Sequence, residues 1–276
     1  MRFNKNILVL VNPRKDQQVA LDKAIRMCRR LGATITALVR DKHAQVPGLL
    51  EILDRKLEAA AAEGIEVSVK ISDDNNWFRA IHRTLAEQPF GLVIKEAHKP
   101  TLADHVFLPD DWKLLRSTQH PVLLVHADNE WNNSAMLLCV DGNPRDQEHA
   151  QLNERIIKAG KLIGEVGQSQ THLFSAHPST MQDVASSQPT DASIAADYRR
   201  VCRSLIDADR VPDQQLHIGP GPAELVIPEL AQQLDAKLVV LGTVARSGLK
   251  GVLLGNTAEQ VAKRLTTDLL VLPPET

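Results

Sequence analysis

The chain has 276 residues, enough for two domains of ordinary size that each bury a hydrophobic core. Its 32 Lys and Arg residues nearly balance its 34 Asp and Glu residues, which argues against a basic nucleic-acid-binding surface and against an acidic tail. The three cysteines lie far apart, a pattern that favours buried, reduced thiols over a disulfide framework.

The N-terminal segment contains an apolar run of only five residues, 7–11. This run is too short for a signal peptide or a membrane span, so we expect it to form the first β-strand. No other apolar stretch approaches the length of a membrane span. We therefore expect a soluble, cytoplasmic protein with no membrane partner and no nucleic-acid partner.

The first half alternates short apolar runs with segments of helical periodicity. Strands are expected at residues 7–11, 34–39, 65–71, 91–95 and 121–125. Helices are expected between them at residues 20–31, 49–63, 77–87 and 111–117. Gly32 follows the first helix directly and is expected to close it.

The second half repeats this order. Its strands are expected at residues 136–140, 171–176, 215–218, 237–241 and 268–272, and its helices at 152–163, 192–208, 222–234 and 257–266. Gly164 or Gly167 is expected to end the first of these helices. Segment 179–193 is rich in Ser, Thr, Gln and Ala, and we expect a flexible loop insertion there.

Alternating helices and purely apolar strands predict an α/β fold with a doubly wound parallel sheet in each half. We expect the domains to span residues 1–127 and 134–276, with a short polar linker between them. In such sheets ligands bind at the carboxyl ends of the strands, near the point where the strand order reverses. This rule places Asp141 and the loop after Leu241 at one crevice of the second half.

The segment 241–260, LGTVARSGLKGVLLGNTAEQ, follows the fourth strand of the second half and ends in a helix. Asn256 is expected to cap that helix, with Glu259 three residues later completing a capping box. The free backbone amides at Gly255, Asn256 and Thr257 attract an anion such as phosphate.

Glycines at positions 242 and 255 let a ligand approach the backbone, and Arg246 and Lys250 add positive charge nearby. A purely structural strand-to-helix turn remains an equal alternative on spacing alone. Other nucleotide motifs are absent: the sequence contains no G-x-x-x-x-G-K-[ST], and Gly219-Pro-Gly221 continues to Glu224 instead of a third glycine.

These residues resemble the universal stress protein family, whose nucleotide-binding members carry G-x2-G-x9-G-[ST] after the fourth strand. Gly242, Ala245, Gly255 and Asn256 occupy the four places. The resemblance extends over both halves, including FLPDDWKLLR in the first, and is to the E-type tandem members in bacteria. It implies two tandem Rossmann-like domains, each a five-stranded parallel sheet flanked by helices, packed as an intrachain pseudo-dimer, and it leaves homodimer formation open. It further implies a stress-response role.

The resemblance also implies an adenine-nucleotide site (ATP, ADP or AMP) in the second domain. The residues expected to line it are Val140, Asp141, Ala176, Leu241, Gly242, Ala245, Arg246, Gly255, Asn256 and Thr257. Asp141 takes the place of the family's acidic residue that meets the adenosine. Two positions depart from the pattern: Ala245 replaces a glycine, where a Cβ narrows the phosphate approach, and Asn256 replaces Ser or Thr.

The first half departs much further from the family pattern. Asn12 replaces the acidic residue, and the segment 95–100 has no glycine pair. Pro109 removes an amide donor from the place that a phosphate uses. We therefore expect no nucleotide site in the first domain.

The ten histidines show neither i,i+4 pairing on a helix nor a cysteine neighbour, so no metal site is expected. No nucleophile, base and orienting acid can be assembled, and we expect a binding and regulatory protein that is not an enzyme. Two alternatives stay open. The chain could be a non-nucleotide interaction protein that binds another small phosphorylated or acyl-bearing ligand, or a slow ATP hydrolase that uses the same crevice.

Overall fold

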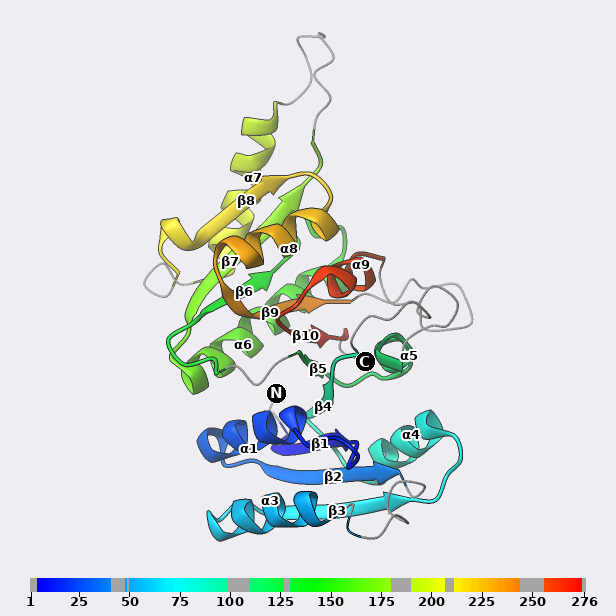
Figure 1. Cartoon of the computed structure of the whole chain (residues 1–276). Helices are drawn as coiled ribbons and strands as arrows, with labels where there is room; N and C mark the ends of the chain where they lie inside the picture. Colours follow the sequence, from blue (N-terminus) through cyan, green and yellow to red (C-terminus); the bar gives the residue numbers. More distant parts are fainter. Residues whose placement is uncertain are drawn as a thin grey trace. The chain divides into compact units, whose positions relative to one another are not determined.

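The structure is a computed structural model that describes residues 4–40, 48, 50–98, 110–126, 130–179, 190–206, 211–243 and 256–274. The chain divides into two compact units, Met1–Asp128 and Asn129–Thr276 (Figure 1). The division falls at the start of the polar segment that the sequence analysis assigns to the linker. None of the helices in the described ranges is long and apolar enough to cross a membrane.

The first unit is an α/β layer structure. Its strands are β1 (Asn6–Val11), β2 (Thr34–Arg40), β3 (Val67–Ser72), β4 (Leu92–Glu96) and β5 (Val122–Val125). Its helices are α1 (Val19–Leu31), α3 (Glu51–Ala62), α4 (Trp77–Glu87) and α5 (Asp110–Ser117). The strands pair in parallel in the order β3-β2-β1-β4-β5. Strand order therefore reverses between β1 and β4.

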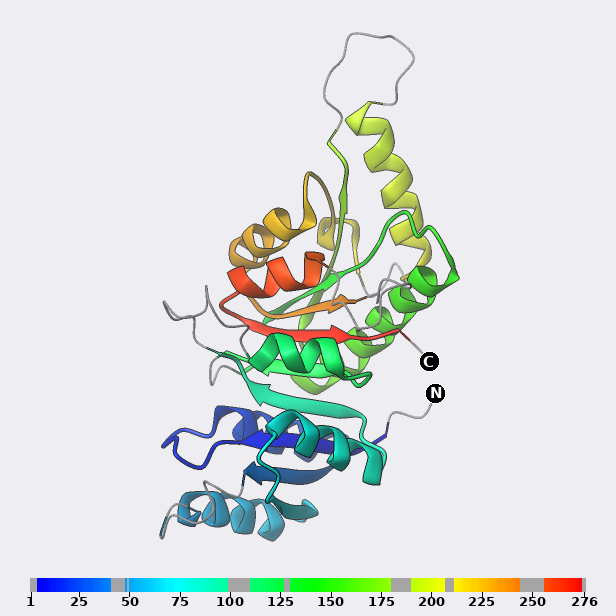
Figure 2. The ribbon, with the colours of Figure 1, turned by 90° about the vertical axis from the view of Figure 1, so that its right-hand side faces the viewer.

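The second unit repeats this arrangement. Its strands are β6 (Ala135–Cys139), β7 (Gln170–His177), β8 (Leu216–Pro220), β9 (Ala236–Gly242) and β10 (Asp268–Leu272). Its helices are α6 (Gln147–Gly167), α7 (Asp191–Ser204), α8 (Ala223–Gln233) and α9 (Asn256–Arg264), and a 3₁₀ turn, η2 (Asp213–Gln215), precedes β8. The parallel order is β8-β7-β6-β9-β10. Figure 2 shows α8 and α9 on one face of this sheet and α6 and α7 on the other.

The apolar runs form the strands because helices cover both faces of each sheet. Ile7–Val11 of β1 and Met136–Cys139 of β6 are all buried. The predicted doubly wound α/β fold is confirmed, and every predicted strand has its counterpart at nearly the predicted place. The first helix ends as predicted, with Gly32 in the left-handed conformation at φ +58°.

The end of α6 differs from the prediction. Neither Gly164 nor Gly167 takes the left-handed capping position; Gln168 does, at φ +49°. Gly167 is instead the last helical residue, and a Cβ added there would lie 3.0 Å from the carbonyl oxygen of Trp131. Glycine at this position therefore permits a close approach between the helix and the segment before β6.

Two helix starts also differ. Helix α6 begins at Gln147, before the predicted residue 152, because the side chain of Asp146 caps it by accepting from the His149 amide at 2.9 Å. Helix α7 begins at Asp191, inside the segment predicted as a loop insertion, and Thr190 caps it. The rest of that predicted loop, residues 180–189, lies outside the described residues.

Candidate functional site

The carboxyl ends of β6 and β9 form the centre of the candidate site in the second unit. These strands are neighbours, with Cys139 paired to Leu241, so the following residues, Val140 and Gly242, lie side by side. On the other side of β6, the Val140 amide donates to the Phe174 carbonyl of β7 at 3.0 Å, and Ala176 lies two residues beyond Phe174. Strand pairing thus brings Val140, Asp141, Ala176, Leu241 and Gly242 to one edge of the sheet.

Asp141 is held at this edge by Asn153 of α6. The Asn153 side chain accepts from the Asp141 amide at 2.8 Å and donates to the Asp141 carbonyl at 2.7 Å. One carboxylate oxygen of Asp141 accepts from the Asn143 amide at 2.9 Å. Asn153 is only 2% exposed, so this two-bond clamp is shielded from water. The sequence analysis did not identify Asn153, although a polar residue between the apolar Leu152 and Ile156 could have indicated it.

Gly142 follows Asp141 and is a point of close packing. Its amide donates to the hydroxyl of Ser175 at 2.9 Å. A Cβ on Gly142 would lie 2.4 Å from the ring of Tyr198, which comes from α7, so no larger residue fits unless that ring shifts. The loop after β6 is therefore fixed by α6 on one side and by α7 on the other.

Gly242 is also closely packed in the structure. A Cβ added there would lie 2.4 Å from Cδ2 and 2.5 Å from Cγ of Leu152, which is itself buried. Packing against α6 is thus a sufficient reason for glycine at this position, whatever ligand approaches the strand end. This supports the structural alternative for Gly242.

Helix α9 begins at Asn256, one residue before the predicted start, so Asn256 is the first helical residue and not the residue preceding the helix. Thr257 is exposed, and Ala258, Val261 and Leu265 form the buried face, as their periodicity indicates. Ala245, Arg246 and Gly255 lie outside the described residues, as do Lys250 and the side chain of Asn256. The anion-binding part of the predicted site therefore stays a prediction.

The corresponding edge of the first unit carries different side chains. Strand β1 pairs with β4 through Leu10 and Lys95, as β6 pairs with β9 through Cys139 and Leu241. Counting from these pairs, Asn12, Arg40, Lys95 and Glu96 stand where the second unit has Asp141, Ala176, Leu241 and Gly242. Three charged residues thus replace apolar residues and a glycine, in line with the expectation that this unit has no nucleotide site of the family kind.

The three thiols of the protein are buried. Burial raises the pKa of Cys28 to about 12 and of Cys202 to about 11, and it raises the pKa of Cys139 as well. Because the thiolate is the reactive form, we expect iodoacetamide at neutral pH to label the native protein far more slowly than the urea-unfolded protein. Intact-mass measurements over time check this, and rapid labelling of a native thiol would contradict it.

A histidine pair joins β7 and β8 in the second unit. Nδ1 of His172 lies 3.0 Å from Nε2 of His217, and the ring planes are inclined by only 18°. Such an N–H···N bond needs one neutral ring as the acceptor. Partial burial lowers the pKa of both rings, helped by His217 for His172 and by Arg199 of α7 for His217.

The lowered pKa values make stability depend on pH. The native protein binds fewer protons than the unfolded chain near the ordinary histidine pKa, so this contribution is present above that pKa and is lost as the pH falls. We expect the free energy of unfolding to decrease from about pH 7.5 to about pH 5, and to decrease less in His217→Gln. Urea denaturation at both pH values checks this, and an equal slope in the variant would contradict it.

Among the described residues, no group of three or more His, Cys, Asp or Glu side chains is placed to hold a metal ion.

Comparisons with known proteins identify relatives over the whole chain. The universal stress protein family matches residues 135–273. The chain is 31% identical to universal stress protein E of Salmonella typhi, with 100% of this chain and 96% of the relative covered. It is 30% identical to the universal stress protein E homolog of Haemophilus influenzae, with 99% and 98% covered.

Two solved structures show the same fold. A protein of unknown function from Pseudomonas aeruginosa is 33% identical and superposes with a TM-score of 0.82 over 98% of this chain and 92% of its own. A universal stress protein from Archaeoglobus fulgidus superposes with a TM-score of 0.64 over 98% of each chain, at 14% identity.

Proposed function

Since the chain belongs to the universal stress protein family, which supports a role in the stress response, we propose that it is a binding and regulatory protein of that response. We propose further that its second unit holds an adenine-nucleotide site. ATP, ADP and AMP share the adenosine group that Asp141 would face. Their phosphates would lie against the amino end of α9. Binding of the nucleotide, and not its chemical conversion, would then regulate the protein.

One observation supports this proposal most. Asp141 and Gly242 stand at the carboxyl ends of two neighbouring parallel strands, β6 and β9, where the strand order reverses. This is the position at which doubly wound sheets bind ligands. The carboxylate of Asp141 accepts only one hydrogen bond from the described backbone, from Asn143, which leaves acceptor positions for a ribose hydroxyl.

The Asp141 carboxylate is tested by a substitution that keeps the loop. Asp141→Asn retains an oxygen that accepts from the Asn143 amide, so the turn persists while the negative charge is lost. We expect ATP affinity, measured by isothermal titration calorimetry, to fall by about tenfold, since a charge-assisted hydrogen bond is worth about 1.5–3 kcal/mol. Unchanged affinity would remove Asp141 from the site.

The phosphate part is tested by two substitutions in the loop. Ala245→Gly restores the family pattern and is expected to raise ATP affinity by about fivefold, because relieving a Cβ conflict is worth about 1 kcal/mol. Gly255→Val is expected to abolish anion binding while the protein stays folded, and Gly164→Ala in α6 serves as a remote control. If Ala245→Gly changes nothing and Gly255→Val only lowers the melting temperature, the glycines serve the turn alone.

Native mass spectrometry of the purified protein decides between the nucleotide and another small phosphorylated or acyl-bearing ligand. A retained adenine nucleotide supports the proposal, and a different retained mass supports the interaction-protein alternative. Phosphate release from ATP over hours tests slow hydrolysis, for which we propose no catalytic residues.

We also propose a cytoplasmic location and packing of the two units as a pseudo-dimer. Fractionation checks the location, and small-angle scattering checks the packing.

A further inference from the structure

The first unit has a cleft of its own at the carboxyl ends of β1, β2 and β4. Its volume is about 270 Å³, just below the usual range of about 300–1,000 Å³ for ligand sites, so it suits a small ligand. Leu10 and Val11 of β1 and Ala20 and Leu21 of α1 form an apolar floor, and the half-buried Trp77 of α4 forms a wall. The charged residues that line the cleft are Lys15, Arg40, Lys95, Glu96 and Asp110.

Nearly all of these charges have an ion-pair partner within the protein. Lys15 pairs with Glu96 at 2.7 Å. Lys95 pairs with Asp111 at 2.5 Å, and Asp110 with Lys113 at 3.5 Å. Arg40 differs: its guanidinium donates through Nη2 to the backbone carbonyl of Asn75, and among the described residues no carboxylate pairs with it. Counting the described residues alone, Arg40 is therefore the charged lining residue without an oppositely charged partner.

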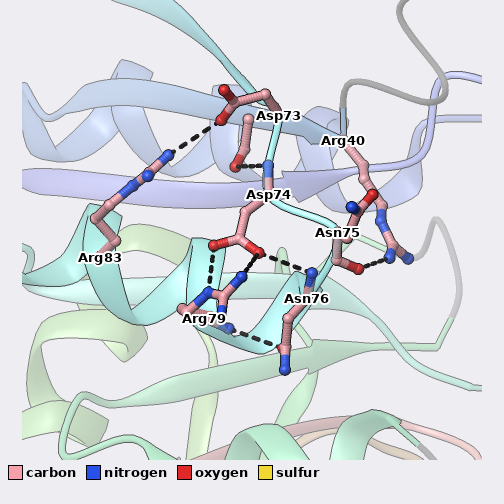
Figure 3. Close-up of polar contacts among 8 residues, drawn as sticks. Arg40, Asp73, Asp74, Asn75, Asn76, Arg79 and Arg83 are labelled. Carbon is pink, nitrogen blue, oxygen red and sulfur yellow. Dashed lines mark hydrogen bonds and ion pairs between the residues drawn. The ribbon is translucent and has the colours of Figure 1, made fainter.

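The loop after β3 holds Arg40 in place, as Figure 3 shows. Asp74 forms a bidentate pair with Arg79 of α4 at 2.6 and 2.8 Å and accepts from the Asn76 amide at 2.8 Å. Arg79 beside it lowers the pKa of the Asp74 carboxyl to about 2, so this contact persists at any physiological pH. The Asn75 carbonyl between these anchors accepts from Arg40. Within the described part of the chain this is the one hydrogen bond that the guanidinium makes, so its other donors can face a ligand.

We propose that this cleft binds a small organic anion with a flat apolar group, whose carboxylate or phosphate pairs with Arg40 and whose apolar part packs on Trp77. Arginine is suited to this task because its planar fork makes two parallel hydrogen bonds to either anion. An indole ring offers a flat apolar face to a planar ligand. Lys95 and Glu96 stand where the second unit has Leu241 and Gly242, so two charged side chains replace an apolar residue and a glycine at this edge of the sheet. We therefore propose a ligand other than a nucleotide.

The proposal can be tested on the full chain with 4-bromobenzoate, an aromatic carboxylate whose bromine quenches tryptophan fluorescence. Trp112 and Trp131 are each only 5% exposed, so Trp77 is the accessible reporter. We expect saturable quenching by 4-bromobenzoate and none by the uncharged 4-bromobenzamide. Arg40→Gln is expected to weaken binding by about tenfold or more, since it removes a charge-assisted pair. Arg40→Lys keeps the charge but not the planar guanidinium, so its affinity for 4-bromobenzoate should lie between those of the wild type and Arg40→Gln.

Three controls separate binding at Arg40 from nonspecific charge effects, from unfolding and from changes in the fluorescent reporter. Arg30→Gln removes an exposed arginine of α1 and should leave the affinity unchanged. Circular dichroism shows whether the Arg40 variants fold, and calorimetry of Trp77→Phe shows binding without the fluorescent reporter. Competition by inorganic phosphate would support a phosphate as the anionic group, and absence of competition would support a carboxylate. Equal affinity in Arg40→Gln, equal binding of the amide, or displacement by ATP would overturn the proposal.

Discussion

Replacing Gly242 by alanine is expected to destabilise the second unit by about 1–3 kcal/mol, the usual cost of forcing an extra methyl group into a packed core. The added Cβ would lie 2.5 Å from Cγ of Leu152, a branch point that rotation about χ2 does not move. Urea denaturation of wild type and variant measures the effect. Gly164→Ala is a matched control, because the nearest atom to its Cβ, the Met136 methyl, is 3.4 Å away.

A double-mutant cycle shows whether Leu152 is the cause. Leu152→Ala alone is expected to cost about 2–5 kcal/mol, because it leaves a cavity in the core. In the double variant the shortened side chain at position 152 makes room for the new Cβ at position 242. The two losses should then sum to about 1–3 kcal/mol more than the loss in the double variant. Strict additivity would mean that another contact requires glycine at position 242.

Replacing Trp131 by phenylalanine is expected to destabilise the second unit by about 1–3 kcal/mol, because it removes a buried hydrogen bond to a carboxylate. The indole Nε1 of Trp131 donates to Oδ2 of Asp268 at 2.9 Å, and Asp268 is fully buried at the start of β10. Trp131→Ala also removes a large buried ring and should cost about 3–5 kcal/mol. Urea denaturation followed by far-ultraviolet circular dichroism measures both.

A conservative change at the acceptor tests the cause of this loss. Asp268→Asn keeps an oxygen for the indole and should cost less than Asp268→Ala. Trp77→Phe replaces a half-buried tryptophan of the first unit and should cost less than about 1 kcal/mol. If Trp131→Phe is no more costly than Trp77→Phe, the contact with Asp268 contributes little to stability.

The strands were the most predictable part of the fold. In β1 and β9 nearly every residue is apolar, because each side chain faces a helix layer on one side of the sheet or the other. Helix ends were less predictable. The start of α6 depends on a single capping bond from Asp146, and its end depends on Gln168, a residue other than glycine in the left-handed conformation.

The candidate site was predictable in position but not in its packing. The rule for doubly wound sheets places Asp141 and Gly242 at one crevice from the amino-acid sequence alone. It could not indicate that Asn153 clamps Asp141 or that Leu152 fills the space over Gly242, since helical periodicity tells which face of α6 is buried but not which atoms lie opposite.

The first unit shows the same division between sequence and structure. Asn12 and Pro109 marked the loss of the family's nucleotide pattern in the sequence alone. The cleft around Arg40 emerged only from the structure, because its lining residues come from β1, α1, β2, α4, β4 and α5 and from the loop between β1 and α1.

The sequence by itself determined the order of strands and helices, the repeat and the edge of each sheet where ligands would bind, because these depend on local hydrophobic patterns and on the short-range chirality of βαβ connections. Only the tertiary structure decided which charges are paired and which glycines are needed for packing. Ion pairs such as Lys95 with Asp111, and close approaches such as Leu152 to Gly242, join residues far apart in the chain. Their geometry is determined only when the helices pack against the sheet.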